Sequence, residues 1–233
     1  MTTQLEEALA MDGPLHPDLV KWWQERLPTL RDLDELFDSP LHPLQRRREL
    51  EKMLHLVADS LIHRPGLTVM EIGADKGGSA WAWLHELNPA RMIVCEIRGT
   101  PYWQLFQMRF RRQKFCWLPA SSYAPSTVEQ VQRWLGDRPI DVLFLDGDKS
   151  FFDRDFDCYL PVLATDAVVF FHDVQDTAPR EAYERVLTRG YRHLEIVDTS
   201  EVAELGQPVT AYEHWLKHWN GASCGVGVVF LGG

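Results

Sequence analysis

The sequence lacks the features that mark membrane, exported and nucleic-acid-binding proteins. No apolar run approaches the ~18 residues of a membrane-spanning helix, and residues 1–15 show no basic stretch followed by an apolar one. Basic residues are also few, with 24 Lys and Arg against 34 Asp and Glu and a net charge of -10. Phosphate backbones recruit Lys and Arg and repel acidic surfaces. We therefore expect a cytoplasmic protein that binds neither a membrane nor nucleic acid.

Cysteine and metal-binding spacings are scarce as well. The chain has four cysteines, far apart and without a C-x-x-C pair, at Cys95, Cys116, Cys158 and Cys224. This spacing gives little support to disulfides or a zinc knuckle, so reduced thiols are expected. His214 and His218 stand four residues apart, but no Glu follows the first as in H-E-x-x-H. A surface or packing role is therefore favoured over metal binding for this pair.

Residues 1–64 are predicted to form a helical appendage. Prolines divide this part of the chain into short amphipathic stretches, at Pro14, Pro17, Pro28, Pro40 and Pro43. Apolar residues recur at helical spacing over residues 50–61, which makes a stripe suited to packing on a sheet. Residues 46–48 are all Arg and lie near the start of this helix, where the dipole disfavours cations. We interpret them as a solvated basic face rather than an anion site.

From residue 65 onward the pattern changes to strand, turn and helix, repeated. Short apolar runs alternate with helix-length segments, and two weaker strands follow; the strands are predicted at 67–72, 92–97, 140–145, 167–171, 191–197 and 225–231. Runs that are apolar on both faces and alternate with helices indicate a parallel sheet buried on both sides. Residues 65–233 are therefore predicted to form one α/β domain, doubly wound and mostly parallel.

The first functional signal is a glycine-rich loop at residues 73–79, which follows the first strand and opens a helix. Glycine lets the backbone turn tightly, and free N–H groups at a helix N-terminus attract a carboxylate or phosphate. The loop is not the dinucleotide pattern G-x-G-x-x-G, because position 75 is Asp, and alone it is equally consistent with a plain turn. Glu96 ends the next strand, where an acid accepts hydrogen bonds from ribose hydroxyls, and this favours an adenosine-containing ligand.

Two further strands end in acidic residues. Asp146 follows the run 140–145, and Asp173 follows the run 167–171 after His172. Carboxylates at the carboxyl ends of parallel strands converge above the sheet, where they repel each other unless a cation joins them. Hard oxygen ligands favour Mg²⁺. The alternative is a pair of helix N-caps, since Asp commonly begins the helix after a strand, and of the two we favour the metal.

The glycine loop, Glu96 and a serine pair resemble the class I S-adenosylmethionine-dependent methyltransferases. The shared pattern is E-x-G-x-x-x-G-G-S, then the acid, then two serines after a predicted third strand. The resemblance covers residues 67–174 and implies a seven-stranded Rossmann-like sheet. In that family the loop holds the methionine end of the cofactor, the acid holds the ribose and the serines lie near the adenine. The implied S-adenosylmethionine site is Glu71, Gly73, Gly77, Ser79, Glu96, Ser121, Ser122 and Asp146.

The segment around Asp146 resembles the metal-dependent O-methyltransferases of the catechol and caffeoyl-CoA type, which carry D-x-x-K. Its D-G-D-x-x-F and F-H-D runs are also similar to bacterial sugar and macrolide O-methyltransferases and to the cephalosporin-hydroxylase-like group. The resemblance implies that Asp146, His172 and Asp173 bind a divalent metal, and that Lys149 is the catalytic base with a lowered pKa. Two departures leave the substrate class open. The sugar group often has His in place of Lys149, and the second catechol-type ligand is Asn in place of Asp173.

These signals together predict an O-methyltransferase that uses S-adenosylmethionine and Mg²⁺. Its expected partner is a small hydroxylated molecule, phenolic or a sugar or other natural product, and the sequence is compatible with a homo-oligomer. Two alternatives stay open, a noncatalytic nucleoside-binding module of the same fold and a cephalosporin-hydroxylase-like oxidoreductase. Against oxidation, the sequence has no nicotinamide fingerprint and no clear two-His-one-carboxylate triad.

Overall fold

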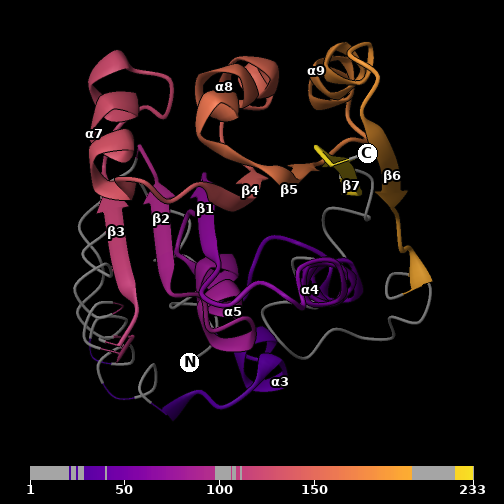
Figure 1. Ribbon diagram of the computed structural model, residues 1–233. Helices are drawn as coiled ribbons and strands as arrows, with labels where there is room; N and C mark the ends of the chain where they lie inside the picture. The colour runs from indigo at the N-terminus through magenta and orange to yellow at the C-terminus, as the bar shows by residue number, and fades with distance from the viewer. Residues whose placement is uncertain are drawn as a thin grey trace.

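The computed structural model describes most of the chain from residue 29 to residue 200 and a short C-terminal segment. The described residues are 21, 25, 29–39, 41–97, 106, 109–110, 112–200 and 224–232. They form a central sheet with helices on both faces (Figure 1). The pair His214 and His218 lies outside the described residues, so the role expected for it stays a prediction.

A seven-stranded sheet runs through the centre of the described part. Its strands are β1 (Thr68–Ile72), β2 (Arg91–Cys95), β3 (Lys114–Leu118), β4 (Ile140–Leu145), β5 (Leu163–His172), β6 (Arg192–Ile196) and β7 (Val226–Phe230). They lie in the order β3-β2-β1-β4-β5-β7-β6, and only β7 runs antiparallel to its neighbours β5 and β6. This confirms the predicted doubly wound, mostly parallel Rossmann-like sheet.

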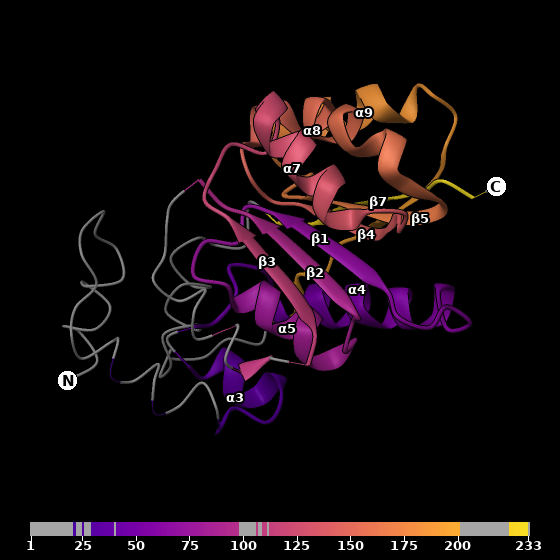
Figure 2. The same cartoon turned by 60° about the vertical axis from the view of Figure 1, so that its left-hand side comes forward.

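Helices cover both faces of the sheet, as Figures 1 and 2 show. One face carries α7 (Pro125–Leu135), α8 (Phe152–Tyr159) and α9 (Thr177–Leu187), and the other carries α3 (Leu33–Phe37), α4 (Arg47–Ser60) and α5 (Gly78–Glu86). Two 3-10 turns, η2 (Lys149–Phe151) and η3 (Leu160–Val162), flank α8. Because β1, β4 and β7 are covered on both sides, every residue in these strands is buried.

Helix α4, from the predicted appendage, packs into the same core as the sheet. Its Met53 and Val57 are fully buried and share one apolar cluster with Trp83 of α5 and Phe144 of β4. These residues belong to the stripe that the helical spacing predicted. The appendage therefore contributes to the fold of the main sheet through α4.

Arg46, which immediately precedes α4, is not part of an exposed basic face. Its side chain is fully buried, and its Nη1 donates to Glu49 Oε1 at 2.9 Å and to the carbonyl of Asp198 at 3.1 Å. Glu49 is also fully buried and accepts the backbone N–H groups of Asp198 and Gly225 at 3.0 and 3.3 Å. The prediction of a solvated face is therefore wrong for Arg46, because a buried carboxylate one helical turn away compensates its charge.

The strand order places a ligand cleft between β1 and β4. The chain winds outward from β1 through β2 and β3, and then returns to add β4 on the other side of β1. In open parallel sheets, ligands bind beyond the carboxyl ends of the strands at such a switch point. The loops 73–77 and 146–148 leave the sheet there. Within the described part of the chain, no helix has the length and apolar character needed to cross a membrane.

Candidate cofactor and acceptor site

A cavity of about 570 Å³ opens beyond the carboxyl ends of the central strands. Its size lies within the roughly 300–1,000 Å³ of small-molecule sites. Most of the residues predicted for the site line it: Gly73, Ser79, Glu96, Ser121, Ser122, Asp146, Lys149, His172 and Asp173. Gly77, within the loop, and Glu71, in β1 beneath it, are not among the lining residues. We call the part around residues 73–79, 96 and 121–122 the loop end, and the part around 45, 146–149 and 172–173 the charged end.

Glycine is required in the loop by close approach of other chain segments. Gly73 has a φ of +82°, and a Cβ there would lie 2.5 Å from Gly147 Cα. Gly77 has a φ of +91°, and a Cβ there would lie 2.8 Å from the ring of Phe106. A side chain at either position would strain the backbone and push the loop away from its neighbour. The two glycines thus set the path of the loop that begins the cavity.

Glu96 binds the glycine loop itself. Its Oε2 accepts the backbone N–H of Ala74 at 3.0 Å and that of Asp75 at 2.9 Å. The residue is only 7% exposed and lies in the cavity wall. The sequence pointed to this acid as a partner of a ribose, and the structure adds a contact to the loop that the spacing did not reveal. Glu96 therefore holds the loop and also faces the cavity.

Glu71 and Ser79 form a buried pair beneath the loop. Ser79 Oγ donates to Glu71 Oε1, and the Glu71 side chain is fully buried. Burial raises the pKa of Glu71 well above its usual value, although the hydrogen bond from Ser79 acts in the opposite direction. Glu71 Oε2 has no hydrogen-bond partner among the described residues. A buried oxygen of this kind is available to a water or ligand donor.

The two serines differ in their hydrogen bonds: Ser122 bonds to the protein core, and Ser121 faces the cavity. Ser122 Oγ donates to Asp155 Oδ1 at 2.6 Å, and Tyr159 donates its hydroxyl to the Ser122 carbonyl at 2.6 Å. Ser121 Oγ is buried, lies in the cavity lining and has no hydrogen-bond partner within the described residues. Of the two hydroxyls, that of Ser121 is the one available to a ligand.

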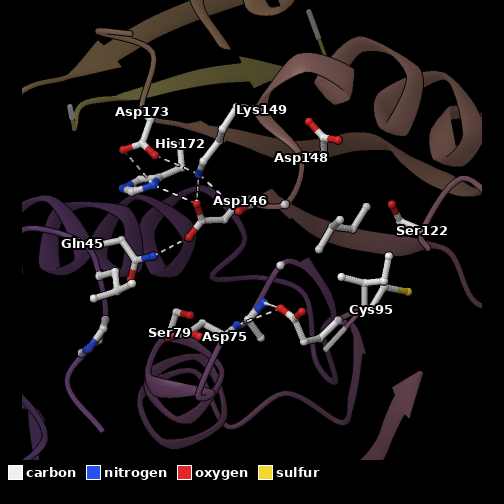
Figure 3. A pocket seen from close by; sticks show the side chains of 18 of the residues that line it. Gln45, Asp75, Ser79, Cys95, Ser122, Asp146, Asp148, Lys149, His172 and Asp173 are labelled. Carbon is white, nitrogen blue, oxygen red and sulfur yellow. Dashed lines mark hydrogen bonds and ion pairs between the residues drawn. The ribbon is translucent and has the colours of Figure 1, made fainter. Parts of the chain in front are cut away.

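At the charged end, four charged side chains converge (Figure 3). Lys149 Nζ contacts Asp146 Oδ1 and lies 2.8 Å from Asp173 Oδ2. His172 Nδ1 lies 2.9 Å from Asp146 Oδ1 and 3.2 Å from Asp173 Oδ1. The acids that end β4 and β5 thus come together, as parallel strands require. Lys149 and His172 lie between them.

The neighbouring charges shift the pKa of each group in this cluster. Burial acts to lower the pKa of Lys149, but the charges of Asp146 and Asp173 outweigh it and raise this pKa above its usual value. Burial also acts to lower the pKa of His172, but Asp146 and Asp173 outweigh it and raise this pKa to about 9. Burial acts to raise the pKa of Asp173, yet His172 and Lys149 lower it to about 2. The lowered pKa expected for a base at Lys149 is therefore not found.

The donors at this end do not fit the predicted Mg²⁺ site. Mg²⁺ takes a near-octahedral set of oxygen ligands, in which one or two protein carboxylates with free oxygens are completed by water. Among the described residues, the group of three such ligand atoms that all lie within 4.8 Å of one another comes from His172, Asp173 and Cys224, which offer one nitrogen, one oxygen and one sulfur. Burial raises the pKa of Cys224 to about 12, so it stays a neutral thiol. Asp146 is not in this group and contacts Lys149 and His172 instead.

The segment before α4 reaches the charged end, which sequence reasoning missed. Gln45 Nε2 donates to Asp146 Oδ2 at 2.6 Å across 101 positions of sequence (Figure 3). Gln45 Oε1 is buried and has no hydrogen-bond partner in the described part of the chain. At Gly78 a Cβ would lie 2.2 Å from the carbonyl oxygen of Leu41, so this segment crosses the start of α5. No local pattern marks these contacts, because they join distant parts of the chain.

Comparison with known proteins agrees with this geometry. Residues 70–174 match a family model described as a methyltransferase domain, whereas no curated protein matches the chain in sequence. The chain is similar to the O-methyltransferase from Bacillus cereus in complex with SAH, at 15% identity and a TM-score of 0.57, over 91% of this chain and 96% of that one.

Two further solved structures share the fold. The O-methyltransferase TomG from Streptomyces achromogenes, in complex with SAM, is 16% identical with a TM-score of 0.51 over 100% of this chain and 97% of that one. The N-methyltransferase NodS from Bradyrhizobium japonicum, in complex with S-adenosyl-L-homocysteine, is 16% identical with a TM-score of 0.50 over 98% and 97%. Residues 70–174 are therefore similar to a methyltransferase domain, and the described residues share the fold of these solved methyltransferases.

Proposed function

We propose that the chain is an S-adenosylmethionine-dependent O-methyltransferase that acts on a small molecule. The observation that carries the proposal is that one cavity joins the loop end, with Glu96, to the charged end, with Asp146 and Lys149. A methyl donor and a methyl acceptor need two such neighbouring subsites. The complexes of the Bacillus cereus enzyme with SAH and of TomG with SAM support the same cofactor here.

The polar groups of the loop end fit S-adenosylmethionine. The N-terminus of α5 offers backbone N–H groups to its carboxylate. Glu96 in the cavity wall would hold the ribose, and the hydroxyl of Ser121 would lie at the adenine. Glu71 Oε2, buried below the loop and outside the cavity lining, would accept a hydrogen bond from the amino group through a water. The roles of Glu96 and Ser121 follow the family resemblance, and those of the α5 N-terminus and Glu71 are inferred from the structure.

The charged end would bind and activate the acceptor. S-adenosylmethionine, when bound, supplies a methyl group to which the acceptor oxygen forms its new bond as the carbon–sulfur bond breaks and leaves its electron pair on sulfur. The walls of the cavity align the two partners for this in-line transfer. The positive charge of Lys149 lowers the pKa of a hydroxyl bound beside it, which makes the oxygen a better nucleophile.

The proton of the acceptor hydroxyl needs a destination, and we assign it to Asp173. With Lys149 and His172 both protonated at neutral pH, the carboxylates are the unprotonated groups of the cluster. Asp173 is the more exposed of the two, at 17% against 12% for the Asp146 side chain. Its low pKa makes it a weak base. A weak base suffices once the new bond forms, because a methylated hydroxyl is far more acidic than the free one.

A binding measurement and a turnover measurement test the proposal separately. Calorimetry with S-adenosylmethionine should show one site per chain. Mass spectrometry of small phenols and sugars incubated with the protein and S-adenosylmethionine should show products heavier by one methyl group. Binding without any product across acceptor classes would favour the noncatalytic module, and absence of binding would contradict the proposal as a whole.

A second candidate is methyl transfer to an amine nitrogen. Asp148 and Asp176 also line the cavity, so its charged end carries more acidic side chains than the cations of Lys149 and His172 balance. A surplus of carboxylates favours a cationic acceptor. Including primary and secondary amines in the same mass-spectrometric screen decides between the two acceptor classes.

A further inference from the structure

The charged end already contains a cation between its two carboxylates. Lys149 Nζ contacts Asp146 Oδ1, lies 2.8 Å from Asp173 Oδ2 and lies 3.2 Å from the backbone carbonyl of Asp146. An ammonium group has three N–H donors, and here each has an acceptor. Figure 3 shows the amine of Lys149 pointing to the carboxylates of both acids.

The remaining carboxylate oxygens are also bound by nitrogen groups. Asp146 Oδ2 accepts from Gln45 Nε2 at 2.6 Å, and Asp173 Oδ1 lies 3.2 Å from His172 Nδ1. All four oxygens of the two acids thus have a nitrogen partner. A divalent cation at this place would have to displace several of these contacts, and it would meet the ammonium charge of Lys149 at short range.

Local structure holds Lys149 in this position. It begins the turn η2, whose N-cap is Asp148, so its side chain starts one turn after Asp146. Its amine also lies 5.5 Å from the centre of the Phe152 ring, a favourable cation–π distance. The side chain is 32% exposed, which limits its freedom to swing away. The bridge between the acids therefore follows from the D-x-x-K spacing and the turn that it forms.

We propose that the ammonium group of Lys149 takes the place of a divalent metal between Asp146 and Asp173. The charged end then assembles without a metal ion. If the proposed function holds, methyl transfer proceeds in the presence of a chelator. This differs from the metal dependence that the family resemblance implies, because the ammonium group of Lys149 already lies between the two carboxylates.

Manganese binding to the full chain tests the proposal without any substrate. The metal-free protein is titrated with Mn²⁺ and free Mn²⁺ is followed by electron paramagnetic resonance, for the wild type, for Lys149→Met and for a matched control, Lys76→Met. Lys76 lines the same cavity at the loop end. We expect no stoichiometric binding to the wild type or the control below about 1 mM, and binding of one ion to Lys149→Met at least about 10-fold tighter. The double variant Lys149→Met/Asp146→Asn should lose this gain.

Two results would overturn the proposal. One is binding of one Mn²⁺ to the wild type at micromolar concentration, and the other is a Lys149→Met protein that binds Mn²⁺ no better than the wild type. If Lys149→Met does not fold in metal-free buffer, the wild-type titration still decides the first point, and Lys149→Gln, which keeps a polar side chain, decides the second. Failure of the proposed function would show elsewhere, as a lack of S-adenosylmethionine binding in calorimetry.

Discussion

The loop end of the cavity is formed largely by one short stretch of chain and its neighbouring strand, whereas the charged end joins segments far apart in the sequence. Glu96 reaches Ala74 and Asp75 across 22 and 21 positions. Gln45 reaches Asp146 across 101 positions, and His172 reaches the same acid across 26. The loop end uses mainly backbone N–H groups and glycine geometry, and the charged end uses side-chain charge. Changes at the two ends should therefore separate binding of the methyl donor from turnover.

The largest expected effect is on turnover at the charged end. Lys149→Ala removes the positive charge beside the acceptor oxygen and should lower turnover by about 10²–10³-fold, the usual effect of losing one preorganised electrostatic group. Affinity for S-adenosylmethionine should change little, because the loop end is untouched. Calorimetry and single-turnover mass spectrometry measure the two quantities.

Lys149→Arg is the matched control for charge. It keeps a positive charge on a side chain of different shape and should retain part of the activity. Equal turnover in Lys149→Ala and the wild type would remove Lys149 from the reaction. A large loss of cofactor affinity would instead show that the two ends are not separable.

At the loop end, the largest effect should come from glycine geometry. Gly73→Ala adds a Cβ within 2.5 Å of Gly147 Cα at a φ of +82°, so strain and overlap should together lower the free energy of unfolding by about 3 kcal/mol or more. Gly190→Ala is the matched control, because Gly190 has a φ of +83° and no described atom lies within 4 Å of a Cβ there. Urea denaturation of both variants isolates the overlap from the strain. An equal fall in the free energy of unfolding for both variants would mean that the close approach of Gly73 to Gly147 does not matter.

A smaller effect should follow removal of the acid that holds the loop. Glu96→Ala deletes the acceptor of the Ala74 and Asp75 N–H groups and should weaken S-adenosylmethionine binding by about 1–3 kcal/mol. Glu129→Ala, on the exposed face of α7, is the control and should bind as the wild type does. Unchanged affinity in Glu96→Ala by calorimetry would remove Glu96 from the cofactor site.

The contrast between the ends also explains what the sequence could predict. Buried parallel strands appear in a sequence as short apolar runs, so β1, β2, β4 and β5 were predicted from the pattern. Strand β3 was not among those runs, because its first residues are exposed or only half-buried. Strand β5 begins at Leu163, four residues before its predicted start, because Thr165 and Asp166 interrupt the apolar run and are exposed. The glycine loop and the acids at strand ends were visible for the same reason, since each lies next to a recognisable strand.

Contacts that depend on tertiary packing were not visible. The burial of Arg46 and the reach of Gln45 depend on where α4 and its preceding segment pack, and their local sequence looks polar and solvent-exposed. The same holds for the raised pKa of Lys149. The sequence predicted that Asp146 and Asp173 converge, but not that both carboxylates contact the amine of Lys149 and together raise its pKa. Charge networks of this kind follow from geometry rather than from spacing.

The smallest expected effect concerns the support behind the loop end. Asp155 is fully buried under Ser122, and burial raises its pKa to about 6, although the Ser122 hydrogen bond acts to lower it. Its pKa in the unfolded chain is about 3.9, so the folded state holds the proton more tightly and the free energy of unfolding should fall as the pH rises from about 4 to 6. Above pH 6, Asp155 is ionised in both states and the full cost of burying its charge lowers the free energy of unfolding.

Asp155→Asn removes this titration while keeping an oxygen to accept from Ser122. At pH 8 the free energy of unfolding should rise by about 1 kcal/mol, because the variant no longer buries a charge. The rise is partly offset because the amide NH₂ of Asn would replace Asp155 Oδ2, which has no partner within the described residues. Urea denaturation from pH 4 to 8 measures the difference, with Asp137→Asn, exposed in the turn after α7, as the control. A constant difference between Asp155→Asn and the wild type across this range would show that Asp155 does not titrate there, and that Ser122 is held by a charged carboxylate throughout.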